Sequence, residues 1–280
     1  MWCARASRPS ASPPAANARA ALLALAGLIL SAPSPPALGV PAVVVRHSVL
    51  GRSSEGRAIQ LTRIGSADAP VRVLVIGAIH GDELAGRAVV DRLRRAPPRL
   101  ERRVALWLID DLNPDGAAAG ARQNAHGVDL NRNFPDGWRP IGSPGDTFFS
   151  GRRPLSEPES RLAARLIVRL KPDVTIWYHQ ALALVDLGTV ADRGFPWRYA
   201  RLSGLRAQRL GFLPGVATRW QNRTLGSGSS FVVELPAGAL SREAVRRHVR
   251  AVGDAARHAL ANHREGSPGP LGSGARTVRR

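Results

Sequence analysis

Residues 71–83 have the sequence VRVLVIGAIHGDE, and this stretch decides the fold class. The run from Val71 to Ile79 is almost wholly apolar and rich in β-branched residues, which is typical of a strand buried on both faces of a sheet. It stops at His80-Gly81, and Asp82 to Arg95 then has apolar residues at helical spacing. A buried strand followed at once by a helix indicates a parallel sheet covered by helices.

The same alternation of strands and helices continues on both sides of this stretch. The further strands that we expect are Val43–His47, Arg57–Ile64, Arg103–Ile109, Asp173–His179 and Phe231–Leu235. The further helices that we expect are Ser156–Leu170, with Ser156 as N-cap, Trp197–Leu210 and Ser241–His263. Residues 113–116 (NPDG) predict a turn, and 117–154 predict a long loop of a kind that is usually functional. The sequence therefore predicts a single-domain α/β fold: a mostly parallel mixed β-sheet flanked by helices on both faces, with the site where the strands end.

The first 39 residues have the pattern of a signal peptide. Three arginines precede the apolar run from Ala20 to Ala32, which is followed by prolines and small residues. About 13 apolar residues are too few to span a bilayer, which takes about 20, although an uncleaved N-terminal anchor is the alternative interpretation. Cys3 is the single cysteine and would leave with the signal, so disulfides cannot stabilise the mature chain.

This pattern sets the expected domains and location. We expect a catalytic domain over 40–264 and a disordered basic tail over 265–280 (EGSPGPLGSGARTVRR). The protein is expected to be secreted, periplasmic or associated with the cell wall, with no stable membrane span once the signal is removed.

The chain is strongly basic, with 40 Lys and Arg residues against 21 Asp and Glu residues and a net charge of +19. Lys171 is the single lysine, and the arginines are spread along the chain without a block of five. Such a spread indicates anionic surroundings rather than a nucleic-acid site, so we expect no nucleic-acid partner. With 44% hydrophobic and 22% charged residues, the chain is too hydrophobic for disorder and too charged for a membrane bundle.

Candidate metal ligands lie at two predicted strand ends. His80 and Glu83 are three residues apart at the start of a helix, close enough to share a small cation. His179 ends another strand, and parallel strands deliver their carboxyl ends to the same edge of a sheet. A catalytic zinc ion needs three such ligands and one open position. Taken alone, the spacing of His80 and Glu83 is a weak signal, because a His and a Glu on a first helical turn more often occur there by chance or as capping residues.

Four motifs in order give a more specific indication: HGDE at 80–83, GVDLNRNFP at 127–135, the strand-ending His179 and FVVELP at 231–236. Together they resemble the zinc metallocarboxypeptidase family (carboxypeptidase A-like), and the shorter bacterial branch that includes the murein peptide amidases looks nearest. The resemblance covers about residues 50–262.

The resemblance implies a role for each matching residue. The zinc ligands of one Zn²⁺ ion would be His80, Glu83 and His179, and Asp129 would hold the first zinc histidine. Glu234 would be the catalytic carboxylate, and Arg122 would polarise the scissile carbonyl and hold the oxyanion. Asn131 and Arg132 would bind the carboxylate of the released residue.

The residues around these positions support the chemistry and also depart from the family. Apolar neighbours flank Glu234, which would raise its pKa and suit it to move a proton from water to the leaving amine. Digestive carboxypeptidases carry a tyrosine in the loop before the catalytic glutamate, but residues 211–233 contain none. Because 218–230 is short and rich in Gly and Ser, the pocket is expected to be open.

Two other functions stay open. Zinc deacylases of the succinylglutamate desuccinylase and aspartoacylase group share an HxxE motif, but they are generally intracellular. A peptide-binding module without catalysis would keep the fold, although an intact Glu234 argues against it. The sequence therefore predicts an exported zinc metallopeptidase, a monomer, that hydrolyses a peptide bond next to a residue with a free carboxylate. A cell-wall (murein) peptide is a substrate that fits.

Overall fold

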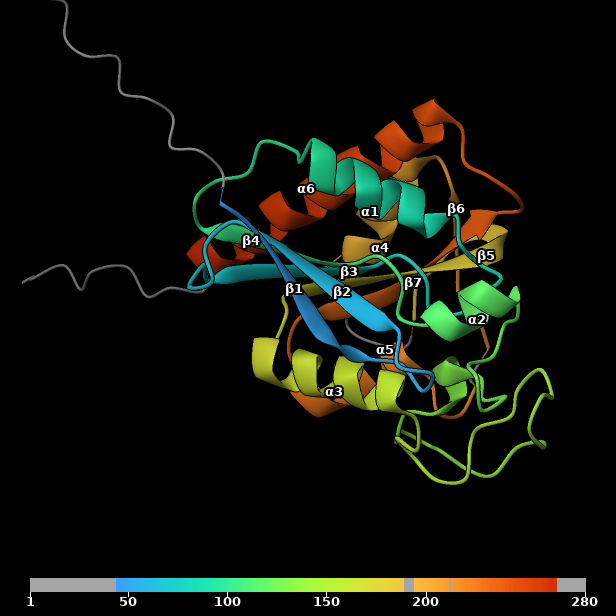
Figure 1. Ribbon diagram of the computed structural model, residues 1–280. Helices are drawn as coiled ribbons and strands as arrows, with labels where there is room; N and C mark the ends of the chain where they lie inside the picture. Colours follow the sequence, from blue (N-terminus) through green and yellow to red (C-terminus); the bar gives the residue numbers. More distant parts are fainter. Residues whose placement is uncertain (1–43, 189–193, 212, 266–280) are drawn as a thin grey trace, which may run out of the picture. The chain divides into compact units, whose positions relative to one another are not determined.

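A seven-stranded mixed sheet forms the centre of the computed structural model, which describes residues 44–188, 194–211 and 213–265 (Figure 1). The strand order is β1-β2-β4-β3-β5-β6, and β7 pairs with β5. The strands are β1 Val45–Arg52, β2 Ala58–Ile64, β3 Val71–Ile76, β4 Val104–Ile109, β5 Val174–Asp186, β6 Arg206–Gln208 and β7 Ser229–Pro236. Among the strand pairs of the described residues, β1–β2 and β2–β4 are antiparallel and the others are parallel, as the strand and helix alternation predicts.

Helices cover both faces of this sheet. They are α1 Gly86–Arg95, α2 Pro114–Ala119, α3 Pro158–Leu170, α4 Phe195–Ser203, α5 Ala217–Leu225 and α6 Arg242–Glu265, with a short 3-10 helix at Leu130–Arg132. Figure 1 shows α1 and α6 above the sheet and α3 and α5 below it. Alternate residues of β3 enter two hydrophobic cores: Val73 and Val75 pack with α1, α4 and α6, whereas Leu74 and Ile76 pack with α3 and α5. The predicted α/β fold class is therefore confirmed.

Several expected element boundaries are wrong, each for a local reason. The helix predicted over Trp197–Leu210 ends at Ser203, because Gly204 adopts a left-handed conformation (φ +77°) and β6 follows. Ser156 is not an N-cap; Glu157 occupies that position, and the Ser156 hydroxyl instead bonds to Glu157 Oε1. The predicted turn at 113–116 opens helix α2, because the Asn113 side chain accepts a hydrogen bond from the Gly116 amide.

Two further elements were not expected. Strand β5 was predicted to end at His179 but continues to Asp186, with an irregular register between Ala181 and Val185. Helix α5 occupies most of the Gly/Ser-rich segment 218–230, for which no helix was expected. Its first residue, Ala217, donates its amide hydrogen to the side chain of Asn131, so a long-range contact starts this helix.

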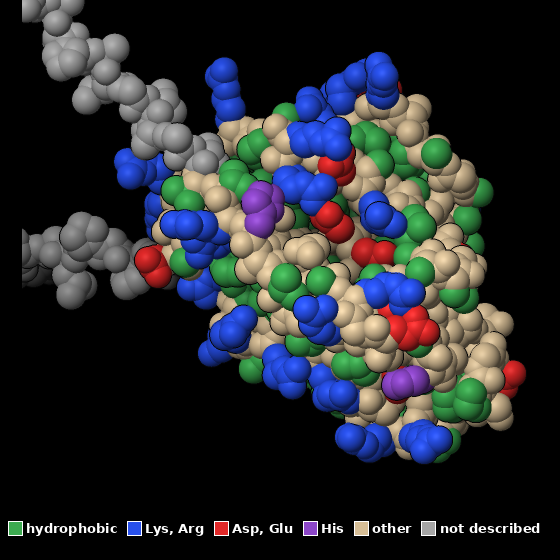
Figure 2. Space-filling model, viewed as in Figure 1, with side chains coloured by type: hydrophobic (Ala, Val, Ile, Leu, Met, Phe, Trp, Pro, Cys, Tyr) green, Lys and Arg blue, Asp and Glu red, His purple; other side chains and the backbone are tan. Residues whose placement is uncertain are grey.

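The predicted chain ends lie almost wholly outside the described residues, which begin at 44 and end at 265. The predicted signal peptide lies outside the described residues. The predicted tail does so too, except for Glu265, which is the last residue of α6. None of the helices in the described ranges combines the length and apolar character that a membrane span requires. Lys and Arg side chains are spread over the face shown in Figure 2.

His248, on the last helix, lies in a buried polar environment. His248 is 2% exposed, and its Nδ1 atom lies 2.9 Å from the hydroxyl of Tyr199, which is itself hydrogen-bonded to Tyr178. Burial, aided by Arg247, lowers the pKa of His248 to about 4. The helix therefore contributes a neutral imidazole to a buried chain of hydrogen bonds that ends at Tyr178 on β5.

This environment makes stability depend on pH. In the unfolded chain the pKa of His248 returns to about 6.5, so between pH 6.5 and 4 the unfolded state binds the additional proton and the folded state loses stability as the pH falls. We expect His248→Gln to remove about 2 to 3 kcal/mol of the difference in unfolding free energy between pH 7 and pH 4.5. Urea unfolding of both proteins at the two pH values measures it; an equal pH dependence would contradict the assignment.

Candidate metal centre and active site

Three neighbouring strands deliver the candidate residues to one edge of the sheet. The loop after β3 carries His80 and Glu83, and the middle of β5 carries His179. On β7, Glu234 is the direct partner of His179 in the parallel register. The predicted placement of His80 and Glu83 on a first helical turn is wrong, because α1 begins only at Gly86; a tight turn, with the Glu83 amide 3.3 Å from the His80 carbonyl, brings them together instead.

His80, Glu83 and His179 form a compact, buried group. One ligand atom from each residue can be chosen so that all lie within 4.8 Å of one another. Glu83 Oε1 lies 3.0 Å from His80 Nδ1, and Glu83 Oε2 lies 2.9 Å from His179 Nδ1. Two imidazole nitrogens and a carboxylate are a donor set that zinc accepts in catalytic sites.

The hydrogen bonding of His80 is what a zinc ligand requires. His80 Nε2 lies 2.9 Å from Asp129 Oδ1, a bond in which the imidazole must donate. Nδ1 is then the nitrogen with the free lone pair. It is buried and, despite its proximity to Glu83, has no hydrogen-bond partner among the described residues. A buried acceptor without a donor, next to a second histidine and a carboxylate, fits a metal ion.

Asp129 organises the site through both of its oxygens. Oδ1 accepts hydrogen bonds from His80 and from the Asn131 amide, and Oδ2 accepts from Arg122 at 3.1 and 3.2 Å. Burial opposes ionisation of Asp129, but His80 and Arg122 outweigh it and hold its pKa below the usual value. The carboxylate is therefore charged although it is fully buried.

Glu234 has a different environment from the other two carboxylates. Its Oε2 atom is buried without a hydrogen-bond partner among the described residues. Burial raises the pKa of Glu234, and the charge of Glu83 adds to this effect, whereas His179 and the Leu182 amide oppose it. A carboxylate with a raised pKa and one free oxygen suits proton transfer.

The two arginines differ in their partners. Arg122 Nη1 lies 2.6 Å from Glu83 Oε1, so this guanidinium is paired with Glu83 as well as Asp129. Arg132 is 4% exposed and forms no salt bridge with any carboxylate in the described ranges; its Nη1 donates to the Asn131 carbonyl. Burial lowers the pKa of Arg132 from its usual value.

Asn131 connects the start of helix α5 to the group formed by His80, Glu83 and His179. Its side-chain oxygen accepts the Ala217 amide hydrogen, and its Nδ2 atom lies 3.5 Å from His179 Nε2. The structure thus brings together all eight residues singled out in the sequence: His80, Glu83, Arg122, Asp129, Asn131, Arg132, His179 and Glu234.

Two glycines allow the loops to approach this closely. A Cβ atom on Gly81 would lie 2.0 Å from the backbone carbon of Gly116, at the start of α2. At Gly215, which has a φ of +70°, a Cβ atom would lie 2.1 Å from the Arg132 carbonyl oxygen. The side chains of other residues would push α2 and the 213–217 segment away from the site.

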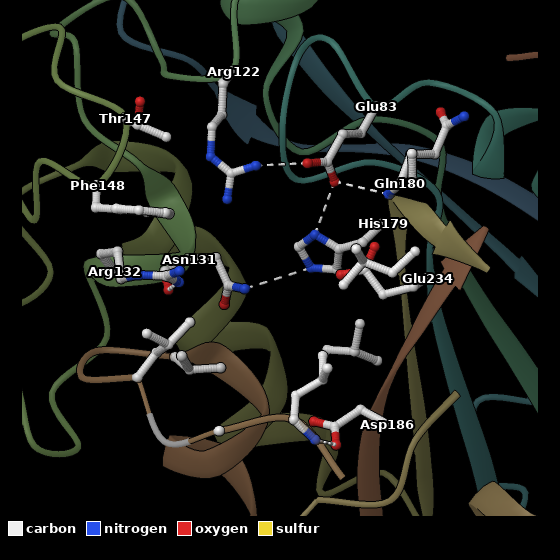
Figure 3. A pocket seen from close by; sticks show the side chains of 17 residues that line it. Glu83, Arg122, Asn131, Arg132, Thr147, Phe148, His179, Gln180, Asp186 and Glu234 are labelled. Atoms are coloured by element: carbon white, nitrogen blue, oxygen red, sulfur yellow. Dashed lines mark hydrogen bonds and ion pairs between the residues drawn. The ribbon is translucent and has the colours of Figure 1, made fainter. Parts of the chain in front are cut away.

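Sequence reasoning missed three residues that line the cavity of about 480 Å³ beside the metal group (Figure 3). The ring of Phe148 lies 4.9 Å from the Arg132 guanidinium and 5.9 Å from that of Arg122. Gln180 accepts the Ala85 amide hydrogen and donates to the carbonyls of residues 236 and 238. Asp186 lies in the extension of β5. Phe148 is in a loop without periodicity, so no sequence signal marked it.

A family model described as zinc carboxypeptidase matches residues 41–225. The chain belongs to the zinc carboxypeptidase family. Zinc is the metal of this family, and the His-Glu-His group supplies its donor set. The match ends before β7, so the family model does not include Glu234. The place of Glu234 in the site follows from its pairing with His179 between β7 and β5.

Individual relatives agree with this family. The chain is 34% identical over 125 residues to murein peptide amidase A of Escherichia coli K12, which covers 40% of the chain and 50% of the relative. It is 35% identical over 121 residues to human carboxypeptidase Z, covering 33% and 19%. The matched part thus spans 50% of the length of the amidase and 19% of the length of carboxypeptidase Z.

Solved structures share the fold. A murein-tripeptide amidase from Escherichia coli O157 superposes with a TM-score of 0.61 at 26% identity, over 75% of this chain and 91% of that one. Carboxypeptidase A from Helicoverpa armigera gives a TM-score of 0.68 at 22% identity, over 79% and 70%. The second likeness concerns the fold alone.

The role of Asp129 predicts a change in metal affinity. In Asp129→Asn one carboxylate oxygen becomes an amide nitrogen, which cannot accept a hydrogen bond from His80 or from Arg122. We expect zinc affinity to fall about 10- to 100-fold. Competition with a chelating indicator measures it.

Asp173→Asn is the matched control. Asp173 also accepts hydrogen bonds, from the Arg72 amide and from His263, but it precedes β5 at the opposite edge of the sheet. Its substitution should leave zinc affinity unchanged. Equal zinc affinities for wild type and a folded Asp129→Asn protein would overturn the role given to Asp129.

Proposed function

We propose that the protein is an exported zinc-dependent peptidase that hydrolyses an amide bond next to a residue with a free carboxylate. The single observation that carries this proposal is Arg132. A guanidinium that is 4% exposed, faces the cavity and has no described carboxylate partner is costly unless an anion binds there. A carboxylate matches its planar pair of donors.

Phe148 and Asn131 support this role of Arg132. The Phe148 ring stacks near the guanidinium, and the hydrogen bond from Arg132 to the Asn131 carbonyl fixes its orientation. Both contacts leave the remaining guanidinium nitrogens available to the cavity. We therefore assign binding of the substrate carboxylate to Arg132 together with Asn131.

Glu234 is the proposed acid and base. When bound by His80, Glu83 and His179, zinc supplies the Lewis acidity that lets water act as a nucleophile near neutral pH. The free Oε2 atom of Glu234 accepts the proton of the attacking water and then passes it to the leaving amine. The raised pKa of Glu234 favours both transfers, because the group can hold a proton between the two steps.

Arg122 is the proposed donor to the scissile carbonyl. It lines the same cavity as Glu234, and its guanidinium is held by Asp129 on one side. Its Nη1 atom forms the ion pair with Glu83, so it lies on the side of the cavity where the candidate zinc ligands are (Figure 3). A cation fixed there stabilises the negative charge that develops on the carbonyl oxygen during attack.

A cell-wall peptide is the proposed substrate, and the protein is proposed to act outside the cytoplasm as a monomer. Three observations support the substrate and the location: the signal-like pattern of residues 1–39, the net charge of +19, and relatives that are murein peptide amidases. Cell-wall peptides carry free carboxylates, which suit the proposed site at Arg132.

The role of Glu234 predicts a specific kinetic defect. Glu234→Gln has nearly the same shape, but the amide cannot accept the proton of the attacking water. We expect zinc content and thermal stability close to wild type, and a kcat lower by about 10² to 10⁴. A folded, zinc-loaded variant with less than a tenfold loss of kcat would assign the base to another residue.

The role of Arg132 predicts a preference for acid over amide substrates. Amidation of the free carboxylate should lower kcat/KM roughly 30-fold or more, because the guanidinium then has no anion. Arg132→Lys should recover little activity on the acid, since an ammonium cannot form two parallel hydrogen bonds. Equal rates for acid and amide on the wild-type enzyme would exclude the carboxylate site.

Wall peptides and acylated amino acids in the same panel, with products identified by mass, separate a peptidase from a deacylase.

A further inference from the structure

Helix α3 and its flanking residues carry a basic surface that the proposed function does not use. Six cations lie on this segment, and none of them forms an ion pair with a described residue. The two acidic residues of the same segment, Glu157 and Glu159, are 3% and 0% exposed, so they do not balance the charge at the surface. We call these six residues the α3 surface: Arg152, Arg153, Arg161, Arg165, Arg169 and Lys171.

The other arginine-rich helices of the chain differ in this respect. On α6, Arg246 and Arg250 both form ion pairs with Glu243. On α1, Arg94 forms an ion pair with Asp91 at 2.9 Å. The arginines of these helices therefore have acidic partners on their own helix, whereas the positive charge of the α3 surface is left without a partner.

The arrangement of the arginines does not serve the stability of α3. Arg161, Arg165 and Arg169 follow one another at intervals of four residues, so they form a row with a spacing of about 6 Å. Like charges at this spacing destabilise a helix. Arg161 donates to the Leu155 carbonyl at 3.0 Å, which fixes its side chain but does not neutralise its charge. An anionic partner outside the chain would remove the repulsion.

Exposed valines accompany these cations. Val168, which lies between Arg165 and Arg169 in the sequence, is 46% exposed. The edge strand β1 packs against α3, and its Val45 and Val49 are 40% and 54% exposed. Figure 2 shows Lys and Arg side chains over α3 and the start of β1. Basic side chains next to exposed apolar ones are typical of proteins that lie on anionic lipid.

A single-stranded nucleic acid fits this surface less well. Sites for such strands combine a basic groove with aromatic side chains on which the bases stack. Helix α3 has no aromatic residue, and its exposed side is convex, as that of any helix is. A broad layer of mobile anionic groups can contact a convex row of cations without a groove.

We propose that the α3 surface docks the protein on a membrane that contains anionic lipid. The guanidinium groups donate hydrogen bonds to lipid phosphates, and the valines contact the apolar part of the interface. None of the six residues lines the catalytic cavity, so the cavity stays open when the protein is docked. This inference does not depend on the proposed function.

Cosedimentation of the purified full-length protein with vesicles tests the proposal. We expect binding to vesicles of phosphatidylcholine with phosphatidylglycerol, much weaker binding to phosphatidylcholine alone, and loss of the difference at high salt because salt screens the charges. The double variant Arg165→Gln with Arg169→Gln should bind the anionic vesicles about 25-fold more weakly, since each basic residue near such a surface strengthens binding about fivefold.

The matched control removes the same amount of charge from another helix. Arg246→Gln with Arg250→Gln lowers the net charge equally, but these arginines are paired with Glu243, so binding should stay within about twofold of wild type. Thermal unfolding of both double variants checks that they are folded.

Three results would overturn the proposal. Equal losses in the two folded double variants would mean that binding follows the net charge and not the α3 surface. Equal binding of the wild type to neutral and anionic vesicles would exclude an attraction by charge. Binding to soluble polyphosphate, with none to the anionic vesicles, would assign the surface to a polyanion in place of a membrane.

Discussion

The buried carboxylate of Asp129 is the interaction on which the rest of the site depends. It joins three segments of the chain: the loop after β3 through His80, the loop after α2 through Arg122, and its own turn through the Asn131 amide. Because the group is charged and fully buried, the loss of any one of these donors would leave a costly unmatched charge. The loops that carry the metal group and the cavity wall are therefore fixed relative to one another by one side chain.

Some polar groups of the site are paired within the protein, and others are not. Asp129, Glu83 and Arg122 satisfy one another inside the protein. Among the described residues of the site, His80 Nδ1, Glu234 Oε2 and the guanidinium of Arg132 keep free hydrogen-bonding capacity. The proposals for the metal, for proton transfer and for the substrate carboxylate rest on these groups. In a native fold such unsatisfied groups are uncommon, which is why they point to ligands.

Much of the architecture follows from local sequence signals. The apolar runs at β3 and β4 indicate buried strands, and the buried segments that precede His80 and His179 bring both histidines to the same edge of the sheet. Element ends were harder to predict. Helix α5 has few apolar residues and begins on the side chain of Asn131, 86 residues earlier in the chain. His248 is buried because Tyr178 and Tyr199 meet it across the core, a contact that helical periodicity cannot report.

The sequence by itself determined the fold class, the metal-binding motif and the family, because these are written in hydrophobic periodicity and in short motifs of fixed spacing. The tertiary structure alone decided which charges are paired. Arg122 and Arg132 are close in sequence and identical in type, yet one faces two carboxylates and the other none. Asp186 carried no sequence signal at all. Whether a charge has a partner depends on contacts between distant segments, and local sequence patterns do not encode such contacts.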